Sequence, residues 1–214
     1  MSDDREDGHA CDASHDHGGD HARGDDYGED DHSHDHDDDH SHDHHDHDGH
    51  DHHQHDVSTL GVAVVTVSTS RSLDDDPSGD AIVETATGAG HEVATRELID
   101  DDFDGVQQTV DALSRRDDVD VVVTTGGTGI TPDDVTVEAV RPLFGKELPG
   151  FGELFRRLSY DDIGTKVVGT RAVAGVVDET PVFCLPGSEN AVDLGVEEII
   201  LPEAGHLVGL ATRE

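Results

Sequence analysis

The segment Thr124–Gly129, which reads Thr-Thr-Gly-Gly-Thr-Gly, has the residue types of an anion-binding loop. It follows the apolar run Val119–Thr124 and precedes a predicted helix at about Asp134–Leu143. Glycines lack a Cβ, so main-chain amides can approach an anion closely, and a helix start adds partial positive charge. The alternative is a tight strand-to-helix turn that needs glycine only for its positive φ. We expect these residues to bind a phosphate or phosphoester: Thr125, Gly126, Gly127, Thr128 and Gly129.

Acidic residues and a second glycine loop lie at other predicted strand ends. Asp134 follows the first loop and could hold Mg²⁺ beside a bound phosphate, or could cap the next helix. The run Asp100–Asp102 ends another predicted strand, where it could contribute to the site or form a solvated loop. Pro186-Gly187-Ser188 follows an apolar run, and its amides could hold a second anion or close a turn. Arg71 and Arg171 are candidate cations for substrate anions, with an ion pair to one of the many acids as the alternative.

The first 56 residues differ from the rest, since they contain 16 of the 18 histidines and no Val, Ile, Leu or Phe. A segment without apolar side chains cannot offset the entropy of ordering its backbone, so we predict a disordered tail. Neutral imidazoles could bind a transition metal there, although a solvated charged tail is the alternative. The predicted metal ligands on this reading are His42, His44, His45 and His47.

The formal net charge of −38 argues against nucleic acid and anionic membranes as partners, because like charges repel. No apolar run is long enough for a membrane span, and the start of the chain lacks a secretory signal pattern. The 2 cysteines do not form a disulfide framework, so we expect a cytoplasmic protein. The many acidic side chains of such a surface repel one another at low salt. This composition therefore predicts a halophilic protein.

Residues 57–214 alternate apolar runs with helical patterns and are predicted to form one domain. This alternation implies right-handed crossovers and an α/β fold with three layers and a mostly parallel sheet. The predicted strands are 60–67, 92–99, 119–124, 171–177 and 181–185. The predicted helices are 80–89, 104–116, 134–143, 151–158, 161–164, 188–200 and 204–210.

The segment Val121–Val135 resembles the signature of the MoaB/Mog-type molybdopterin-binding family. The segments Leu148–Glu153, Arg171–Val176 and Leu185–Ser188 resemble later blocks of the family in the right order. The resemblance covers about Leu60–Leu210. It implies the MoaB/Mog-like fold, a homotrimer or homohexamer, and transfer of AMP from Mg-ATP to molybdopterin in molybdenum or tungsten cofactor biosynthesis.

By motif match, Asp101 and Asp134 are the expected catalytic acids, and Asp134 is also the expected Mg²⁺ ligand. The resemblance places the other substrate contacts at Ser70, Arg71, Pro186, Gly187 and Ser188, besides the glycine loop. Active relatives often have an aspartate near Ser70, which this chain lacks. Two alternatives stay open: a non-catalytic molybdopterin-binding protein, and a metal-handling protein that acts through the His-rich tail.

Overall fold

The computed structural model describes residues 56–213, and these form a six-stranded sheet with the order β2-β1-β3-β6-β5-β4. Strands β2, β1, β3 and β6 are parallel to their neighbours, and β5 pairs antiparallel with both β6 and β4. The predicted mostly parallel α/β sheet is confirmed. The strands are β1 (Gly61–Val67), β2 (Glu92–Ile99), β3 (Val121–Thr125), β4 (Lys146–Glu147), β5 (Val173–Val177) and β6 (Thr180–Leu185).

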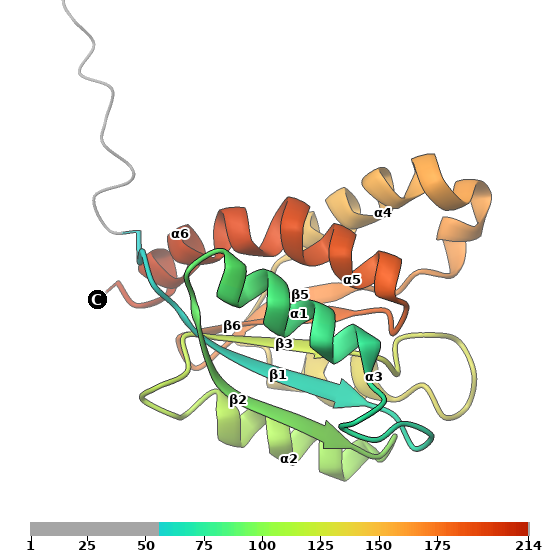
Figure 1. The fold of residues 1–214 in the computed structure, drawn as a ribbon, viewed down its shortest axis with the longest axis horizontal. Helices are drawn as coiled ribbons and strands as arrows, with labels where there is room; N and C mark the ends of the chain where they lie inside the picture. Colours follow the sequence, from blue (N-terminus) through green and yellow to red (C-terminus); the bar gives the residue numbers. More distant parts are fainter. Residues whose placement is uncertain (1–55, 214) are drawn as a thin grey trace, which may run out of the picture. The chain divides into compact units, whose positions relative to one another are not determined.

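Helices cover both faces of the sheet, which gives the three predicted layers (Figure 1). Helices α1, α4, α5 and α6 lie on one face, and α2 and α3 lie on the other. The helices are α1 (Pro77–Gly88), α2 (Phe103–Leu113), α3 (Thr136–Val140), α4 (Pro149–Ile163), α5 (Glu189–Gly195) and α6 (Leu201–Ala211).

Strand β1 explains why the sheet needs both layers. Its side chains alternate between two cores: Val62 and Val64 pack under α1, while Ala63 and Val65 face α2. All four are at most 1 % exposed, so the unbroken apolar sequence of this strand follows from burial on two faces. In β6, Cys184 is buried and its pKa is raised by burial to about 12, as expected of a small apolar residue.

Several predicted boundaries are wrong, each for a local reason. Helix α1 begins at Pro77 rather than Asp80, because Pro77 occupies the first turn and Asp76 caps it. Helix α4 is one helix through 149–163 rather than two short ones. The short strand β4 was not predicted, because a strand of two residues is too short to show an alternating hydrophobic pattern.

Residues 1–55 of the predicted tail, including His42, His44, His45 and His47, lie outside the described residues. Within 56–213, no helix has both the length and the apolar character needed to cross a bilayer.

Candidate functional site

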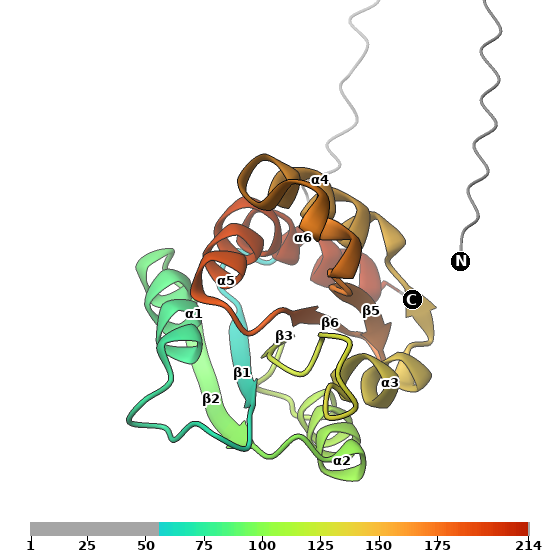
Figure 2. The same ribbon diagram turned by 90° about the vertical axis from the view of Figure 1, so that its right-hand side faces the viewer.

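The loops that follow β1, β3 and β6 lie side by side at the carboxyl edge of the sheet (Figure 2). Ligands of parallel α/β sheets usually bind at this edge. The segment 126–135, called here the glycine bend, joins β3 to α3 in the middle of the group. The structure therefore brings the predicted loops together.

The glycine bend turns sharply at Gly126 and Gly127, which have φ angles of 98° and 62°. Residues with a Cβ rarely adopt such angles. The amide of Gly126 donates to Leu185 O at 3.0 Å. Thr136 holds the other side, since its Oγ1 donates to Gly126 O at 2.9 Å and its amide to Gly127 O at 3.0 Å.

Asp134 folds back into the bend instead of capping α3. Its carboxylate accepts hydrogen bonds from the amide of Thr131 at 2.8 Å and from Thr131 Oγ1 at 2.6 Å, and another from the Gly129 amide. Helix α3 begins at Thr136 without a side-chain cap, so the capping alternative for Asp134 is wrong. One amide of the predicted phosphate cradle, that of Gly129, is therefore already occupied by this carboxylate.

The amides of Gly127 and Thr128 make no hydrogen bond to any residue that the structure describes. They lie in the part of the bend with positive φ, where successive amides can form an anion-binding concavity. Thr125 does not contribute a free hydroxyl, because its Oγ1 donates to Pro186 O at 3.1 Å. Within the predicted cradle, Gly127 and Thr128 are the residues with amides available for a phosphate.

Asp101 is the member of the acidic run that faces the bend. Its Oδ2 accepts a hydrogen bond from the amide of Thr69 at 2.9 Å. Its Oδ1 would lie 3.4 Å from a Cβ built on Gly127. The neighbouring Asp102 instead caps α2 by accepting from the Gly105 amide at 2.8 Å. Asp101 and Asp102 thus have different roles, which their sequence alone could not separate.

The loop after β6 contacts the glycine bend directly. A Cβ on Gly187 would lie 3.2 Å from Gly126 Cα. The carbonyl of Gly187 accepts hydrogen bonds from Arg71 Nη2 at 3.0 Å and from Ser78 Oγ at 2.9 Å. Pro186 and Gly187 therefore bring the β6 loop against the bend.

Asp76 was not among the predicted site residues, yet it holds the loop after β1 together. It is fully buried and accepts hydrogen bonds from Thr66 Oγ1 at 2.6 Å, Gly79 N at 3.1 Å, Arg71 Nη1 at 3.2 Å and Arg96 Nη2 at 3.1 Å. Burial would raise the pKa of Asp76, but the hydrogen bonds from Thr66, Gly79 and Arg96, together with the Arg96 charge, hold it below its ordinary value. The Asp-Pro pair before α1 is a sequence signal that could have indicated it.

Arg71 is thus engaged by protein groups instead of being free for a substrate anion. Its guanidinium links Asp76 to Gly187 and so ties the β1 loop to the β6 loop. The predicted contact Ser70 lies on the exposed part of the β1 loop, with its Oγ 3.3 Å from Ser68 Oγ. The ion-pair alternative for Arg71 is confirmed.

Arg171 has the corresponding role for the glycine bend. Its Nε donates to Thr128 O at 3.2 Å, and its Nη2 donates to Asp134 O at 3.3 Å. The guanidinium also pairs with Glu138 of α3 at 3.1 Å. Burial would raise the pKa of Asp134, but hydrogen bonds from Thr131 and the Arg171 charge lower it.

The carboxylate oxygens at this site fit a Mg²⁺ ion that is bound together with a substrate. The structure describes no group of three or more metal-binding side chains. Asp101 and Asp134 nevertheless both lie at the bend, Asp101 beside Gly127 and Asp134 beside Gly129. Mg²⁺ is commonly held by one or two carboxylates together with substrate phosphates and water. These two residues would hold it.

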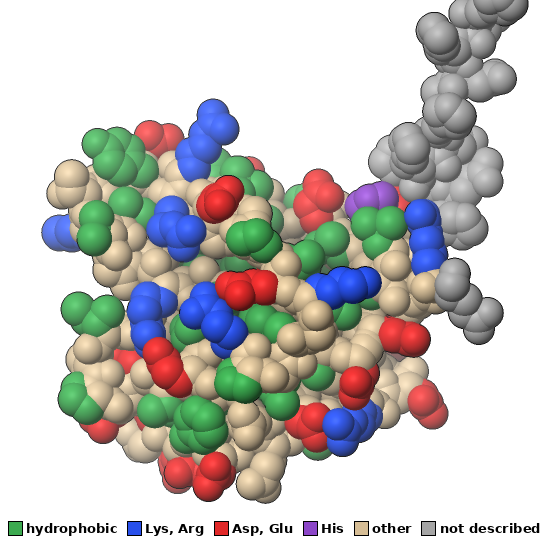
Figure 3. All heavy atoms as spheres, turned by 180° about the vertical axis from the view of Figure 1, so that it is seen from behind, with side chains coloured by type: hydrophobic (Ala, Val, Ile, Leu, Met, Phe, Trp, Pro, Cys, Tyr) green, Lys and Arg blue, Asp and Glu red, His purple; other side chains and the backbone are tan. Residues whose placement is uncertain are grey.

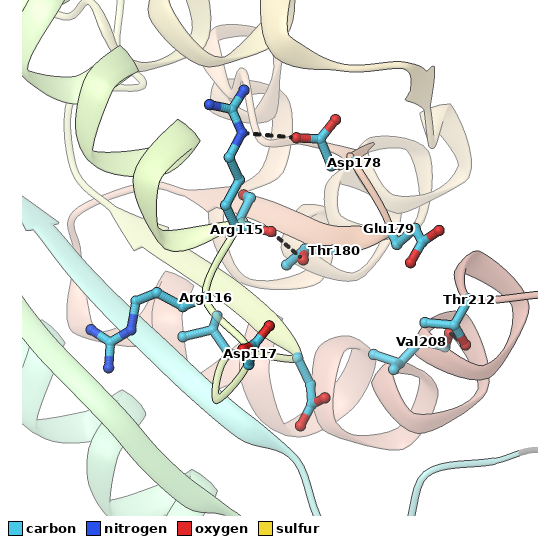
Figure 4. Close-up of a pocket in the computed structure, with 11 residues that line it drawn as sticks. Arg115, Arg116, Asp117, Asp178, Glu179, Thr180, Val208 and Thr212 are labelled. Atoms are coloured by element: carbon cyan, nitrogen blue, oxygen red, sulfur yellow. Dashed lines mark hydrogen bonds and ion pairs between the residues drawn. The ribbon is translucent and has the colours of Figure 1, made fainter.

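Two other parts of the surface of residues 56–213 differ from this site. In the view from behind, Lys and Arg side chains are interspersed with Asp and Glu (Figure 3). A hollow of about 510 Å³ lies at the opposite end of β3, and its arginines point away from each other (Figure 4). Arg115 there pairs with Asp178 at 3.1 Å, and Arg116 pairs with Asp118 at 2.7 Å.

The sequence profile of a probable molybdopterin binding domain matches residues 63–206. The chain belongs to the MoaB/Mog family of molybdopterin-binding proteins. It is 48 % identical over 145 residues to molybdenum cofactor biosynthesis protein B of Bacillus cereus, covering 67 % of this chain and 86 % of that protein. With the Escherichia coli protein of the same name it shares 43 % identity over 142 residues, covering 66 % and 84 %.

Solved MoaB structures have the same fold. A crystal structure of molybdenum cofactor biosynthesis protein B matches with a TM-score of 0.71 and 44 % identity, covering 74 % of this chain and 99 % of that chain. The tungsten cofactor synthesizing protein MoaB from Pyrococcus furiosus matches with a TM-score of 0.65 and 41 % identity, covering 73 % and 99 %. The expected MoaB/Mog-like fold is confirmed.

Proposed function

We propose that this MoaB/Mog chain catalyses transfer of AMP from Mg-ATP to molybdopterin, producing adenylyl-molybdopterin and pyrophosphate. This reaction would serve the biosynthesis of a molybdenum or tungsten cofactor, the pathways for which its relatives are named. The carrying observation is that the amides of Gly127 and Thr128 have no partner among residues 56–213, while the carboxylates of Asp101 and Asp134 lie beside Gly127 and Gly129.

The reaction joins two polyanions, so it requires positive groups rather than a covalent nucleophile. A phosphate oxygen of molybdopterin forms a bond to the α-phosphorus of ATP. The bond from that phosphorus to the β-phosphate oxygen breaks, and pyrophosphate leaves with the electron pair. Bound Mg²⁺ would neutralise charge on the phosphates.

The residues of this chain have distinct tasks in the proposal. The Gly127 and Thr128 amides orient the molybdopterin phosphate, because they are rigid donors that need no reorganisation. Asp101 and Asp134 would hold the metal beside it. Arg71 and Arg171 act on the substrates only by keeping the loops in place.

The test is release of pyrophosphate by the full chain with molybdopterin, ATP and Mg²⁺ at multimolar KCl. We expect Asp134→Asn to lower the rate at least about a hundredfold, since one charged group for the metal is lost. Asp133→Asn is the matched control, because Asp133 is an exposed neighbour. A second pair has the same design: Asp101→Asn is the test variant, and Asp100→Asn, at an exposed neighbour, is its control.

The result also separates the alternatives. Molybdopterin binding without pyrophosphate release would favour a non-catalytic binding protein. Equal rates for Asp134→Asn and Asp133→Asn would contradict the role of Asp134. If removal of residues 1–56 leaves the rate unchanged, the tail has only an accessory role.

A further inference from the structure

The chain enters the described domain along α6, and we call residues 56–58 the tail root. The amide of Val57 donates a hydrogen bond to Gly205 O at 3.1 Å, and the Val57 side chain packs against the core that α6 covers. This close approach requires a glycine in α6, because a Cβ on Gly205 would lie 2.5 Å from Val57 O. The tail root is therefore fixed to the middle of α6.

His206, which follows Gly205 in α6, faces the tail root. Its Nδ1 lies 3.0 Å from Asp56 Oδ1. A carboxylate only accepts hydrogen bonds, so the neutral imidazole carries its proton on Nδ1 and has its lone pair on Nε2. The side chains of His206 and Asp56 are 33 % and 31 % exposed, so an ion from solvent can reach them.

The pair of Asp56 and His206 has the arrangement of a metal-binding histidine. Such a histidine binds the ion through one ring nitrogen and donates the N–H of the other to a carboxylate, which orients the ring and makes it more basic. In this chain the carboxylate belongs to the tail root and the imidazole to α6. Nε2 of His206 is thus the nitrogen that would bind an ion.

Further histidines precede the tail root directly in the sequence. The residues before Asp56 are Asp-His-His-Gln-His, so His52, His53 and His55 come within four residues of it. A chain spans at most about 3.6 Å per residue, so covalent geometry keeps their Cα atoms within about 15 Å of that of Asp56. Because the root is fixed beside His206, these imidazoles are within reach of the same ion.

This set of groups matches a divalent transition-metal ion such as Zn²⁺. Imidazole nitrogen suits such ions, and Zn²⁺ takes three or four protein ligands. Within residues 56–213 no three metal-binding side chains come together, so His206 needs partners from the chain before Asp56. Residues 1–55 carry 20 acidic side chains and 2 arginines, and this negative charge attracts a cation.

We propose that a divalent transition-metal ion binds at the tail root through Nε2 of His206 together with His53 and His55. Asp56 is the positioning residue, since it orients the His206 ring. The site differs from chelation by the tail alone because it exists only in the folded protein, where α6 brings His206 to the root. This inference does not depend on the proposed adenylyl transfer.

The test is thermal unfolding of the full chain, without an added histidine tag, in the presence and absence of Zn²⁺. An ion that binds only the folded state raises the Tm, whereas one that binds the folded and unfolded chain equally leaves it unchanged. We expect saturating Zn²⁺ to raise the wild-type Tm by at least about 3 °C, and His206→Gln to lose this rise. The control is His91→Gln, because His91 is the other histidine after residue 56.

A pair of double variants tests the ligands from the tail. His53 and His55 flank a single residue, and so do His15 and His17, which are far from the root in sequence. Replacing His53 and His55 by glutamine should abolish the rise in Tm, and replacing His15 and His17 should preserve it. Asp56→Asn should increase about tenfold the Zn²⁺ concentration that gives half of the rise, because the His206 ring loses its charged acceptor.

Two results would overturn the site at the tail root. If the wild type binds Zn²⁺ with no change in Tm, or if His206→Gln shows the same rise as the wild type, the tail chelates the ion without α6. If the wild type binds no Zn²⁺ at all, the tail histidines are only solvated charge. Each variant is compared with itself without Zn²⁺, so a change in its intrinsic stability does not affect the conclusion.

Discussion

The carboxylate of Asp101 lies against the main chain of Gly127, across two loops that are distant in sequence. A Cβ built on Gly127 would come 3.4 Å from Asp101 Oδ1 and 2.3 Å from Thr136 Oγ1. With its φ of 62°, Gly127 thus has both a conformational and a steric reason to be glycine. The bend and the acid that would assist it are therefore packed as one unit.

Replacing this glycine should damage both fold and site. We expect Gly127→Ala to lower the free energy of unfolding by roughly 1–3 kcal/mol, because the new Cβ is strained and meets Thr136. Molybdopterin binding should weaken as well, since the Gly127 amide moves. Urea unfolding and calorimetry measure the two effects. Gly150→Ala is the control, because nothing lies within 4 Å of a Cβ there. Equal stability of the two variants would contradict the prediction.

Asp76→Asn should be among the costly substitutions in the chain. The carboxylate is fully buried between Arg71 and Arg96. Its loss leaves Arg71 without its ion pair and Arg96 with only the exposed Asp80 as an acidic partner. We expect a loss of roughly 3 kcal/mol in the free energy of unfolding. Asp75→Asn changes an exposed neighbour and should have little effect. A loss of equal size in both variants would show that local chain charge matters more than the buried pair.

The same variant predicts a pH dependence. The pKa of Asp76 is held below 3.8 in the folded protein, so the folded state binds fewer protons there than the unfolded chain. The stabilisation by Asp76 is therefore present above the ordinary pKa and is lost as pH falls through the lower, folded pKa. The stability difference between wild type and Asp76→Asn should shrink as pH falls below 3.8. Acid unfolding followed by circular dichroism measures it, and a constant difference would refute the assignment.

Arg171→Lys should loosen the glycine bend without removing a charge. A lysine cannot reach Thr128 O, Asp134 O and Glu138 together, because it lacks the planar fork of arginine. We expect the Kd for molybdopterin to rise about tenfold. Arg157→Lys is the control, since Arg157 is exposed and has no ion pair among residues 56–213. An unchanged Kd for Arg171→Lys would mean that the bend keeps its shape without this residue.

Low salt should destabilise the protein. Residues 57–214 carry 30 acidic and 11 basic side chains, a net charge of 11 − 30 = −19. At about 0.1 M salt the Debye length is about 10 Å, so these charges repel one another more strongly than at about 1 M. We expect the Tm of the full chain to fall on desalting, as measured by calorimetry. Equal Tm values at both salt concentrations would remove the halophile interpretation.

Residues that are close in sequence made part of the site predictable. A buried strand, a run of glycines and a helix start follow one another within 121–140, so their geometry depends on local rules. The same holds for the strand alternation and for the strand end at Asp101. The start of α1 at Pro77 was predictable in principle, because an N-cap followed by proline is also a local pattern.

The partners of charged side chains were not predictable in this way. The sequence by itself determined the α/β class, the glycine bend at one sheet edge and the acids beside it, because strand and helix periods are local properties. Only the tertiary structure decided that Asp101 rather than Asp102 faces the bend and that Arg71 reaches Gly187, 116 residues away. Such contacts depend on which loops the folded sheet brings together, and in a chain this rich in aspartate every arginine has many possible partners.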